Sequence, residues 1–206
     1  MSPPRAATDR PGGKPSRGDR SRTEECHLLP RHRKGDTTAF TELMDLYRSP
    51  VFSYLIRSGI PEREREDLFQ DIFLRIHRSA TRYQPSRPLH PWIFTIAANA
   101  VRNYWRSQRV RDLISGEPPL DVIDTAPLGS VVAEGRQTVS FLERRIAQLP
   151  RPQREVLLLV SVEGLSLKET AMALGTPLNT VKTRLHRARL ALVQELGARD
   201  GAEAKA

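Results

Sequence analysis

The sequence has few of the features that mark secreted, membrane-spanning or cysteine-rich proteins. Its 206 residues include one cysteine, Cys26, so no disulfide can form within the chain and no cysteine-based zinc site is expected. No apolar run approaches the ~18 residues that a membrane-spanning helix needs. No apolar segment follows the first basic residues, as a secretory signal would require. We therefore expect a cytoplasmic protein with no membrane insertion.

Motifs for catalysis are also missing. The five histidines are scattered, and the chain contains neither H-E-x-x-H nor G-x-S-x-G. It has no phosphate-binding glycine loop, and no pair of carboxylates is aligned in an apolar setting. We therefore expect no enzymatic activity, no cofactor, and no catalytic or metal-binding residue.

Basic residues are in excess. The formal net charge is +9 and the pI is about 10.4, which favours a polyanionic partner, either nucleic acid or an anionic membrane surface. Charge alone leaves open a basic protein with no such partner. The length suits one domain or two small ones, each with a modest core.

The apolar spacing is helical throughout and predicts an all-α fold of two small domains joined by a flexible linker. Residues 1–22, rich in Pro, Gly, Ser and Arg, are predicted to form a disordered basic tail. Residues 23–111 form the first domain, and 112–136 form an acidic linker rich in proline and glycine. Residues 137–197 form the second domain, and 198–206 a tail.

The first domain contains several predicted helices. Asp36 is a helix N-cap, and the apolar face that follows it continues beyond Pro50 until Gly59 ends the segment. A long helix over 62–80 buries Leu68, Phe69, Ile72, Phe73 and Ile76. Residues 82–91 hold three prolines and are predicted to be a loop. The next helix is expected to run from Trp92 to Arg111.

The second domain carries a helix-turn-helix pattern. Ser166 and Glu169 form a capping box at the start of a short helix. Gly175 can end this helix in the left-handed conformation, and Pro177 suits the first turn of the next. A short helix, a glycine turn and a longer helix make up this motif.

The longer helix has one apolar and one polar face. Its polar face suits the major groove of DNA, because short polar side chains can reach base edges while Arg and Lys pair with phosphates or guanine. The alternative is an ordinary solvated face. The candidate DNA-binding residues are Asn179, Thr180, Lys182, Thr183, Arg184, His186, Arg187 and Arg189.

Two further helix faces in the first domain are unusual. A tryptophan at the head of a polar, basic stripe suits the stacking of single-stranded bases, although Trp92 could instead fold into the core. This stripe and the loop before it hold Arg87, His90, Trp92, Asn99, Arg102, Asn103 and Arg106. The outer face of the 62–80 helix, with an exposed leucine among polar groups, suggests a protein-docking surface; a lone exposed leucine is also common. Its residues are Asp67, Gln70, Asp71 and Leu74.

Taken in order, these segments resemble the extracytoplasmic-function (group IV) sigma factors of bacterial RNA polymerase. Residues 67–77 are similar to the family's D-L-x-Q-[DE]-x-F-L-x-x-[WH] segment, and 91–106 to its W-[LI]-[FY]-x-I-A-x-N segment. Residues 149–160 resemble the L-P-x-x-x-R lead-in. Residues 164–190 resemble the G-x-S-x-x-E…T-V-K-[ST]-R-L-x-R-A-R signature. His77 stands where the family often has tryptophan.

The resemblance implies a role for each surface. The face with Asp67, Gln70, Asp71 and Leu74 would bind the β′ coiled-coil of core RNA polymerase, and a contact with the β flap is also expected. The stripe from Arg87 to Arg106 would hold the melted −10 element of promoter DNA. The Asn179–Arg189 helix would read the −35 element as duplex. An anti-sigma factor is a possible partner. The alternative to this reading is a helix-turn-helix regulator that acts without core polymerase.

Overall fold

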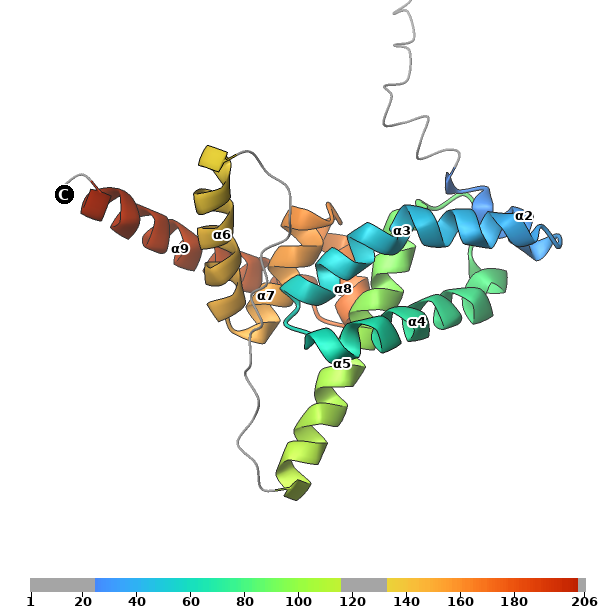
Figure 1. Ribbon diagram of the computed structural model, residues 1–206, viewed down its shortest axis with the longest axis horizontal. Coiled ribbons are helices and arrows are strands. Elements are labelled where there is room, and N and C mark those ends of the chain that lie inside the picture. The colour runs from blue at the N-terminus through green and yellow to red at the C-terminus, as the bar shows by residue number, and fades with distance from the viewer. Residues whose placement is uncertain (1–24, 116–132, 204–206) are drawn as a thin grey trace, which may run out of the picture.

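The computed structural model describes residues 25–115 and 133–203, and the regular elements in both ranges are helices (Figure 1). The first range contains α2 (Leu28–Arg33), α3 (Thr37–Arg57), α4 (Glu62–Ser79), the short 3₁₀ helix η1 (Ala80–Arg82) and α5 (Leu89–Ser115). The second contains α6 (Ala133–Gln148), α7 (Arg151–Leu157), the π-helical turn η2 (Leu158–Val162), α8 (Leu167–Leu174) and α9 (Leu178–Glu203). The predicted all-α fold is confirmed. The tail predicted at 1–22 and most of the predicted linker lie outside the described residues.

Helix α3 begins at the predicted N-cap. The Asp36 carboxylate accepts hydrogen bonds from the main-chain N–H of Thr38 at 3.0 Å and of Ala39 at 3.2 Å. These donors have no partner within the helix, so the cap satisfies them. The Thr38 hydroxyl and Arg31 also bond this carboxylate, and together these bonds lower the pKa of Asp36 to about 2.

Helix α3 continues through Pro50 without a break. Buried side chains lie on both sides of the proline, including Tyr47 before it and Val51 and Leu55 after it. The apolar face therefore continues as the sequence predicted, within a single helix.

Helix α4 carries the centre of the N-terminal core. All five predicted apolar residues are buried, and the ring centroids of Phe69 and Phe73 lie 4.6 Å apart. Phe52 of α3 packs against Phe69 at 4.8 Å. This cluster fixes α4 against α3 and leaves the opposite face of α4 at the surface.

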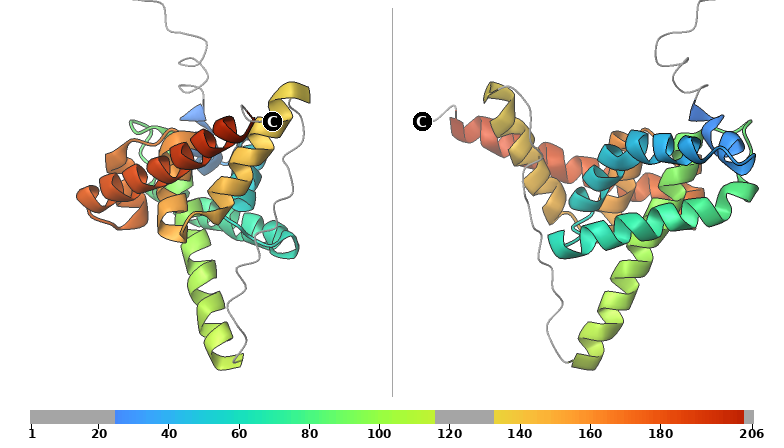
Figure 2. Two further views of the ribbon diagram at one scale, coloured as in Figure 1. Left: turned by 90° about the vertical axis from the view of Figure 1, so that its left-hand side faces the viewer. Right: turned by 45° about the vertical axis from the view of Figure 1, so that its right-hand side comes forward.

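Helix α5 begins earlier than predicted, at Leu89 rather than Trp92. The loop expected over 82–91 is correspondingly shorter, and its first residue lies in η1. Pro91 occupies the first turn of α5, where the missing N–H has no intrahelical acceptor to lose. The helix also extends past Arg111 to Ser115, and its last part projects away from the rest of the molecule (Figures 1 and 2).

The helix-turn-helix forms as predicted. The Ser166 and Glu169 side chains bond each other's main-chain N–H at 3.2 and 2.8 Å and start α8. Gly175 ends α8 with φ of +55°, a conformation that costs glycine little. Helix α9 then packs on α7 and α8 through Val181, Leu185 and Ala188.

The two helical halves lie against each other. Helix α8 of the C-terminal half packs along α5 of the N-terminal half, and α6 contacts α3 (Figure 1). The buried residues of the two halves form one continuous apolar cluster. The surfaces on α5 and on α9 are thus held in one compact arrangement.

Replacing Ile72 by alanine is expected to lower the free energy of unfolding by about 2–5 kcal/mol, because this fully buried side chain leaves a cavity in the core. The matched control is Leu74→Ala on the same helix, where the side chain is 45% exposed and the change should stay within about 0.5 kcal/mol. Denaturant unfolding measures both. Equal losses in the two variants would contradict the placement of α4.

Candidate nucleic-acid and partner-binding surfaces

The polar face of α9 is at the surface and the apolar face is buried. Among the candidate DNA-binding residues, Thr180 and Arg184 are half-buried, and the exposed ones are Asn179, Lys182, Thr183, His186, Arg187 and Arg189. None of the salt bridges between described residues involves the basic side chains of this face. Such a row of cations can approach a duplex without first breaking an ion pair.

Helix α8 and its cap set the direction of α9. The Thr176 N–H donates to the Ala171 carbonyl at 3.0 Å, which closes the turn after Gly175. The start of α9 is therefore held by two neighbouring anchors, the α8 carbonyls and the buried Val181. A rigid start matters because base contacts in this motif come from the N-terminal part of the second helix.

The polar stripe of α5 is formed largely as expected. Asn99 and Arg106 are exposed, Asn103 is half-buried, and Arg106 donates to the Asn103 side-chain oxygen at 2.8 Å. The Asn99 amide group donates to the Thr95 carbonyl at 2.9 Å, so its side-chain oxygen remains free to accept from a base.

Trp92 is half-buried at the head of this stripe. Its ring lies 5.2 Å from the ring of Tyr83, at 54° to it, and it also packs against the edge of the core. The Trp92 ring therefore lies partly against the core, as the alternative in the sequence analysis described, and partly at the surface. Arg87 lies nearby in the loop before α5; its side chain is exposed, and its carbonyl accepts a hydrogen bond from the Tyr83 hydroxyl at 2.8 Å.

Two residues of the stripe contact the other half of the molecule. Because a carbonyl can only accept, the His90 Nε2 donates to the Glu163 carbonyl, at 3.1 Å, and the ring packs 4.5 Å from Phe94. Arg102 donates to the carbonyl of Leu174, the last residue of α8. Both groups therefore contact the other half, His90 as a half-buried residue and Arg102 as an exposed one.

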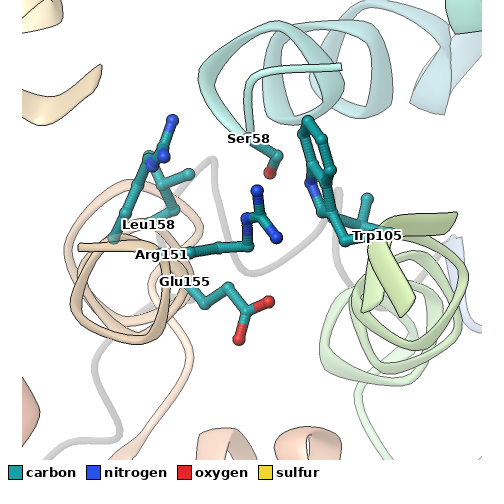
Figure 3. Close-up of a pocket in the computed structure, with 7 residues that line it drawn as sticks. Ser58, Trp105, Arg151, Glu155 and Leu158 are labelled. Atoms are coloured by element: carbon teal, nitrogen blue, oxygen red, sulfur yellow. The ribbon is translucent and has the colours of Figure 1, made fainter. Parts of the chain in front are cut away.

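A second set of contacts joins the halves through side chains that the sequence analysis did not single out. The guanidinium of Arg151 on α7 lies 3.9 Å from the ring of Trp105 on α5, a cation–π contact. Ser58, at the end of α3, and Glu155, on α7, line the same crevice (Figure 3). Burial raises the pKa of Glu155, while nearby arginines, Arg102 first among them, oppose this rise.

One polar atom in this contact is poorly satisfied. The Trp105 indole N–H is buried without a hydrogen-bond partner. Such a group costs about 1–3 kcal/mol relative to its hydrated state. The contact between the halves is therefore less favourable than its apolar area alone suggests.

No pattern in the sequence singles out this contact. Arg154 stands between Gln153 and Glu155, as an exposed arginine would, yet it is only 6% exposed. Its guanidinium nitrogen lies 3.1 Å from the point where a side chain on Gly59 would begin. A buried arginine needs nearby polar groups, and the carboxylate of Glu155, on the same helix, is one of them.

The outer face of α4 lies at the surface of the molecule. Asp67 and Gln70 are exposed, Leu74 is 45% exposed, and Asp71 is half-buried in an ion pair with Arg75 at 2.8 Å. An acidic face with one central leucine suits a partner surface that offers a basic rim around an apolar contact.

Among the described residues, no helix combines the length and the hydropathy needed to cross a membrane.

Residues 43–111 match the family described as Sigma-70 region 2, and residues 142–192 match Sigma-70, region 4. The first match covers α4 and α5 with their surfaces, and the second covers the helix-turn-helix.

Similar proteins cover nearly the whole described chain. The chain is 30% identical to the ECF RNA polymerase sigma factor SigF of Caulobacter vibrioides, over 84% of its own length and 94% of that protein. It is 28% identical to the ECF RNA polymerase sigma factor SigW of Bacillus subtilis, over 80% and 92%.

Solved structures agree with these matches. CnrH, solved in complex with the cytosolic domain of CnrY, is 25% identical, with a TM-score of 0.58 over 84% of this chain and 97% of that one. The sigma factor RpoE of Bartonella quintana, solved with the anti-sigma factor NepR, shares the fold at 24% identity and a TM-score of 0.60, over 77% and 96%.

Proposed function

The chain belongs to the extracytoplasmic-function sigma factors, which bring RNA polymerase to promoters, and we propose that three of its surfaces divide this work. The observation that carries the proposal is the presence of two chemically different polar and basic surfaces on two helices. One, on α5, offers an aromatic ring with amide and guanidinium groups; the other, on α9, offers a row of short polar and basic side chains. The first suits unpaired bases and the second suits a major groove.

The outer face of α4 is the proposed contact with core polymerase. Asp67, Gln70, Asp71 and Leu74 would bind the β′ coiled-coil, with the carboxylates pairing with its basic groups and Leu74 filling an apolar contact. The C-terminal domain would contact the β flap. Both contacts would bring the two DNA-reading helices to polymerase.

The stripe on α5 is the proposed −10 surface. Opening the duplex trades base stacking and pairing for contacts with protein, at a cost of a few kcal/mol for each extruded base. Trp92 would stack on an extruded base, Asn99 and Asn103 would bond base edges, and Arg87, His90, Arg102 and Arg106 would hold the strand and its phosphates. His90 and Arg102 bond the C-terminal half in this structure, so these two hydrogen bonds would have to break before the groups hold DNA.

Helix α9 is the proposed −35 surface. Asn179, Thr180 and Thr183 lie near its start and would reach base edges. The basic residues, Lys182, Arg184, His186, Arg187 and Arg189, would contact guanine or phosphates, so promoter affinity should fall as salt concentration rises.

The domain limits follow the sequence analysis. We propose residues 23–111 as the polymerase and −10 domain and residues 137–197 as the −35 domain, with 112–136 as the connecting segment. Residues 1–22 and 198–206 are proposed as tails. A cytoplasmic location and the absence of an enzymatic activity follow from the role of a transcription initiation factor. A regulator that acts without polymerase is not favoured, because both sigma regions are present in one chain.

An anti-sigma partner is part of the proposal. RpoE of Bartonella quintana was solved with the anti-sigma factor NepR. An inhibitor of this kind would act on the present chain by covering the α4 face or by holding the two halves away from polymerase.

Joint replacement of Asp67 and Asp71 by alanine is expected to abolish start-site selection by core polymerase, because the acidic half of the docking surface is lost. Transcription in vitro on genomic fragments, with mapping of start sites, measures the effect. Glu62→Ala, at the exposed start of the same helix, is the control and should retain selectivity. Unchanged polymerase binding by the double variant in a pull-down would contradict the assignment of this face.

Replacement of Trp92 by alanine is expected to prevent promoter melting while leaving closed-complex binding in place. Permanganate reactivity of thymines in the −10 region reports the open bubble. Trp92→Phe keeps an aromatic face for stacking and should melt the promoter. A normal bubble with the alanine variant would remove Trp92 from the proposed mechanism.

Arg187→Ala is expected to weaken discrimination between the mapped −35 sequence and a scrambled duplex by about 1–3 kcal/mol, if this guanidinium reads a base. Competition binding with holoenzyme measures the ratio. Gln194→Ala, two turns further along the exposed side of α9, is the control. A uniform loss on both duplexes would instead assign Arg187 to a phosphate.

A further inference from the structure

The short loop before α5 is held between two buried residues. Tyr83, which follows η1, is 3% exposed, and Leu89, the first residue of α5, is 2% exposed. The residues between them, 84–88, are all exposed. Positions 85 and 88 are prolines, whose fixed φ reduces the number of conformations that the loop can adopt. The 84–88 loop therefore leaves the core at one fixed point and returns to it at another.

Hydrogen bonds hold Arg87 by both of its main-chain polar groups. The Arg87 N–H donates to the Gln84 carbonyl at 2.9 Å, and Pro85 occupies the second position of this turn, which proline favours. The Arg87 carbonyl accepts a hydrogen bond from the Tyr83 hydroxyl at 2.8 Å. The carbonyl of Arg87 is thus engaged by a buried residue, while its side chain remains exposed.

Two residues near the N-terminal end of the described chain support the same carbonyl. The Cys26 thiol donates a weak hydrogen bond to the Arg87 carbonyl, with 3.8 Å between sulfur and oxygen. The neighbouring Glu25 accepts from the hydroxyl of Tyr47, on α3, at 3.1 Å. The segment that carries Cys26 is therefore fixed to α3, and the loop is supported by residues that lie far from it in the sequence.

The Tyr83 hydroxyl remains a donor over the physiological pH range. Burial raises the pKa of Tyr83, and the hydrogen bond with the Cys26 thiol raises it further. A carbonyl can only accept, so the protonated hydroxyl is the form that the Arg87 carbonyl requires. The bond between Tyr83 and the loop is therefore permanent in the folded chain.

Tyr83 also contacts the residue proposed to stack on an extruded base. The Tyr83 and Trp92 ring centroids lie 5.2 Å apart, with 54° between the ring planes. Trp92 packs against the edge of the core and is half-buried. One buried side chain thus joins the 84–88 loop, through the hydroxyl, to Trp92, through the ring.

We propose that Tyr83 is a positioning residue for strand capture: its hydroxyl, through the Arg87 carbonyl, holds the 84–88 loop in a fixed position relative to Trp92. Because Tyr83 is buried, it acts through these neighbours and not by contact with DNA. An ordered loop has little conformational freedom left to lose when a strand binds, so a larger fraction of the free chain is competent for capture. The inference rests on the proposed assignment of the loop and the α5 stripe to the −10 element.

Tyr83→Phe tests the positioning role, because it removes the hydroxyl and keeps the ring beside Trp92. In the full chain without polymerase, hydrogen exchange at the Arg87 main-chain N–H reports whether the turn is held. We expect this exchange to be faster in the variant than in the parent chain. Circular dichroism and denaturant unfolding check that the variant remains folded.

In holoenzyme on a mapped promoter, Tyr83→Phe should lower the ratio of open to closed complex, measured by permanganate reactivity. The expected loss is about 2- to 12-fold, the range spanned by one net hydrogen bond. Closed-complex affinity should not change, because the duplex and polymerase contacts are intact. Cys26→Ala should lower the ratio in the same direction but by less, because a thiol is a weak donor.

Tyr104→Phe is the matched control. It makes the same chemical change at a half-buried tyrosine of α5 whose charged neighbours are Glu64 and Arg63 of α4 and Arg111 near the far end of α5. This variant should leave both the exchange at Arg87 and the ratio of open to closed complex unchanged.

The outcomes separate the positioning role from the −10 assignment. Faster exchange together with a lower open-to-closed ratio supports the role of Tyr83. Unchanged exchange, or faster exchange with an unchanged ratio, would overturn that role alone, provided that Trp92→Ala still blocks melting. Equal losses in closed-complex binding and in opening would also overturn it, since they would make Tyr83 an ordinary core residue. Normal melting by Trp92→Ala would overturn the −10 assignment and the positioning role with it.

Discussion

The packing of α5 is the constraint on which the rest of the structure depends. One face of this helix, with Ile93, Ala97 and Val101, completes the N-terminal core. A second face carries the polar stripe, and a third receives α8 and the Arg151 side chain. Because one rigid helix serves all three, a shift of α5 in the core would alter both the stripe and the contact between the halves.

The two proposed DNA-binding surfaces differ in how accessible they are in this structure. The net charge of +9 draws the free chain toward any duplex. Most basic side chains of the polar face of α9 are exposed, whereas two groups on α5 bond the C-terminal half. In the proposed function, the exposed side chains of α9 would meet duplex DNA, whereas two groups on α5 would first have to leave their present hydrogen bonds.

Much of the fold was predictable because it depends on local signals. The caps at Asp36 and Ser166, the glycine turn at Gly175 and the apolar face of α4 each involve residues a few positions apart, and all were confirmed. The start of α5 was predicted three residues too late, because the proline at position 91 was read as part of a loop although the first helical turn accepts it.

The contact between the halves could not be predicted in the same way. Trp105 and Arg151, or Arg57 and Glu143, are separated by dozens of residues, and no periodicity relates them. The sequence analysis treated the polar side of α5 as one DNA-facing stripe, whereas in the structure two of its residues bond the carbonyls of Glu163 and Leu174. The assignments of individual DNA-binding residues remain predictions, because they concern a bound state.

Site-specific photocrosslinking of holoenzyme on a mapped promoter tests the central claim most directly, since it asks which DNA each helix touches in one complex. A crosslinking residue replaces Asn99 in one preparation and Lys182 in another. We predict that Asn99 marks the non-template strand near −10 only after melting, and that Lys182 marks duplex near −35 before and after melting. Crosslinks from both positions to the same element, or a strong signal from Asn99 on closed duplex, would contradict the account.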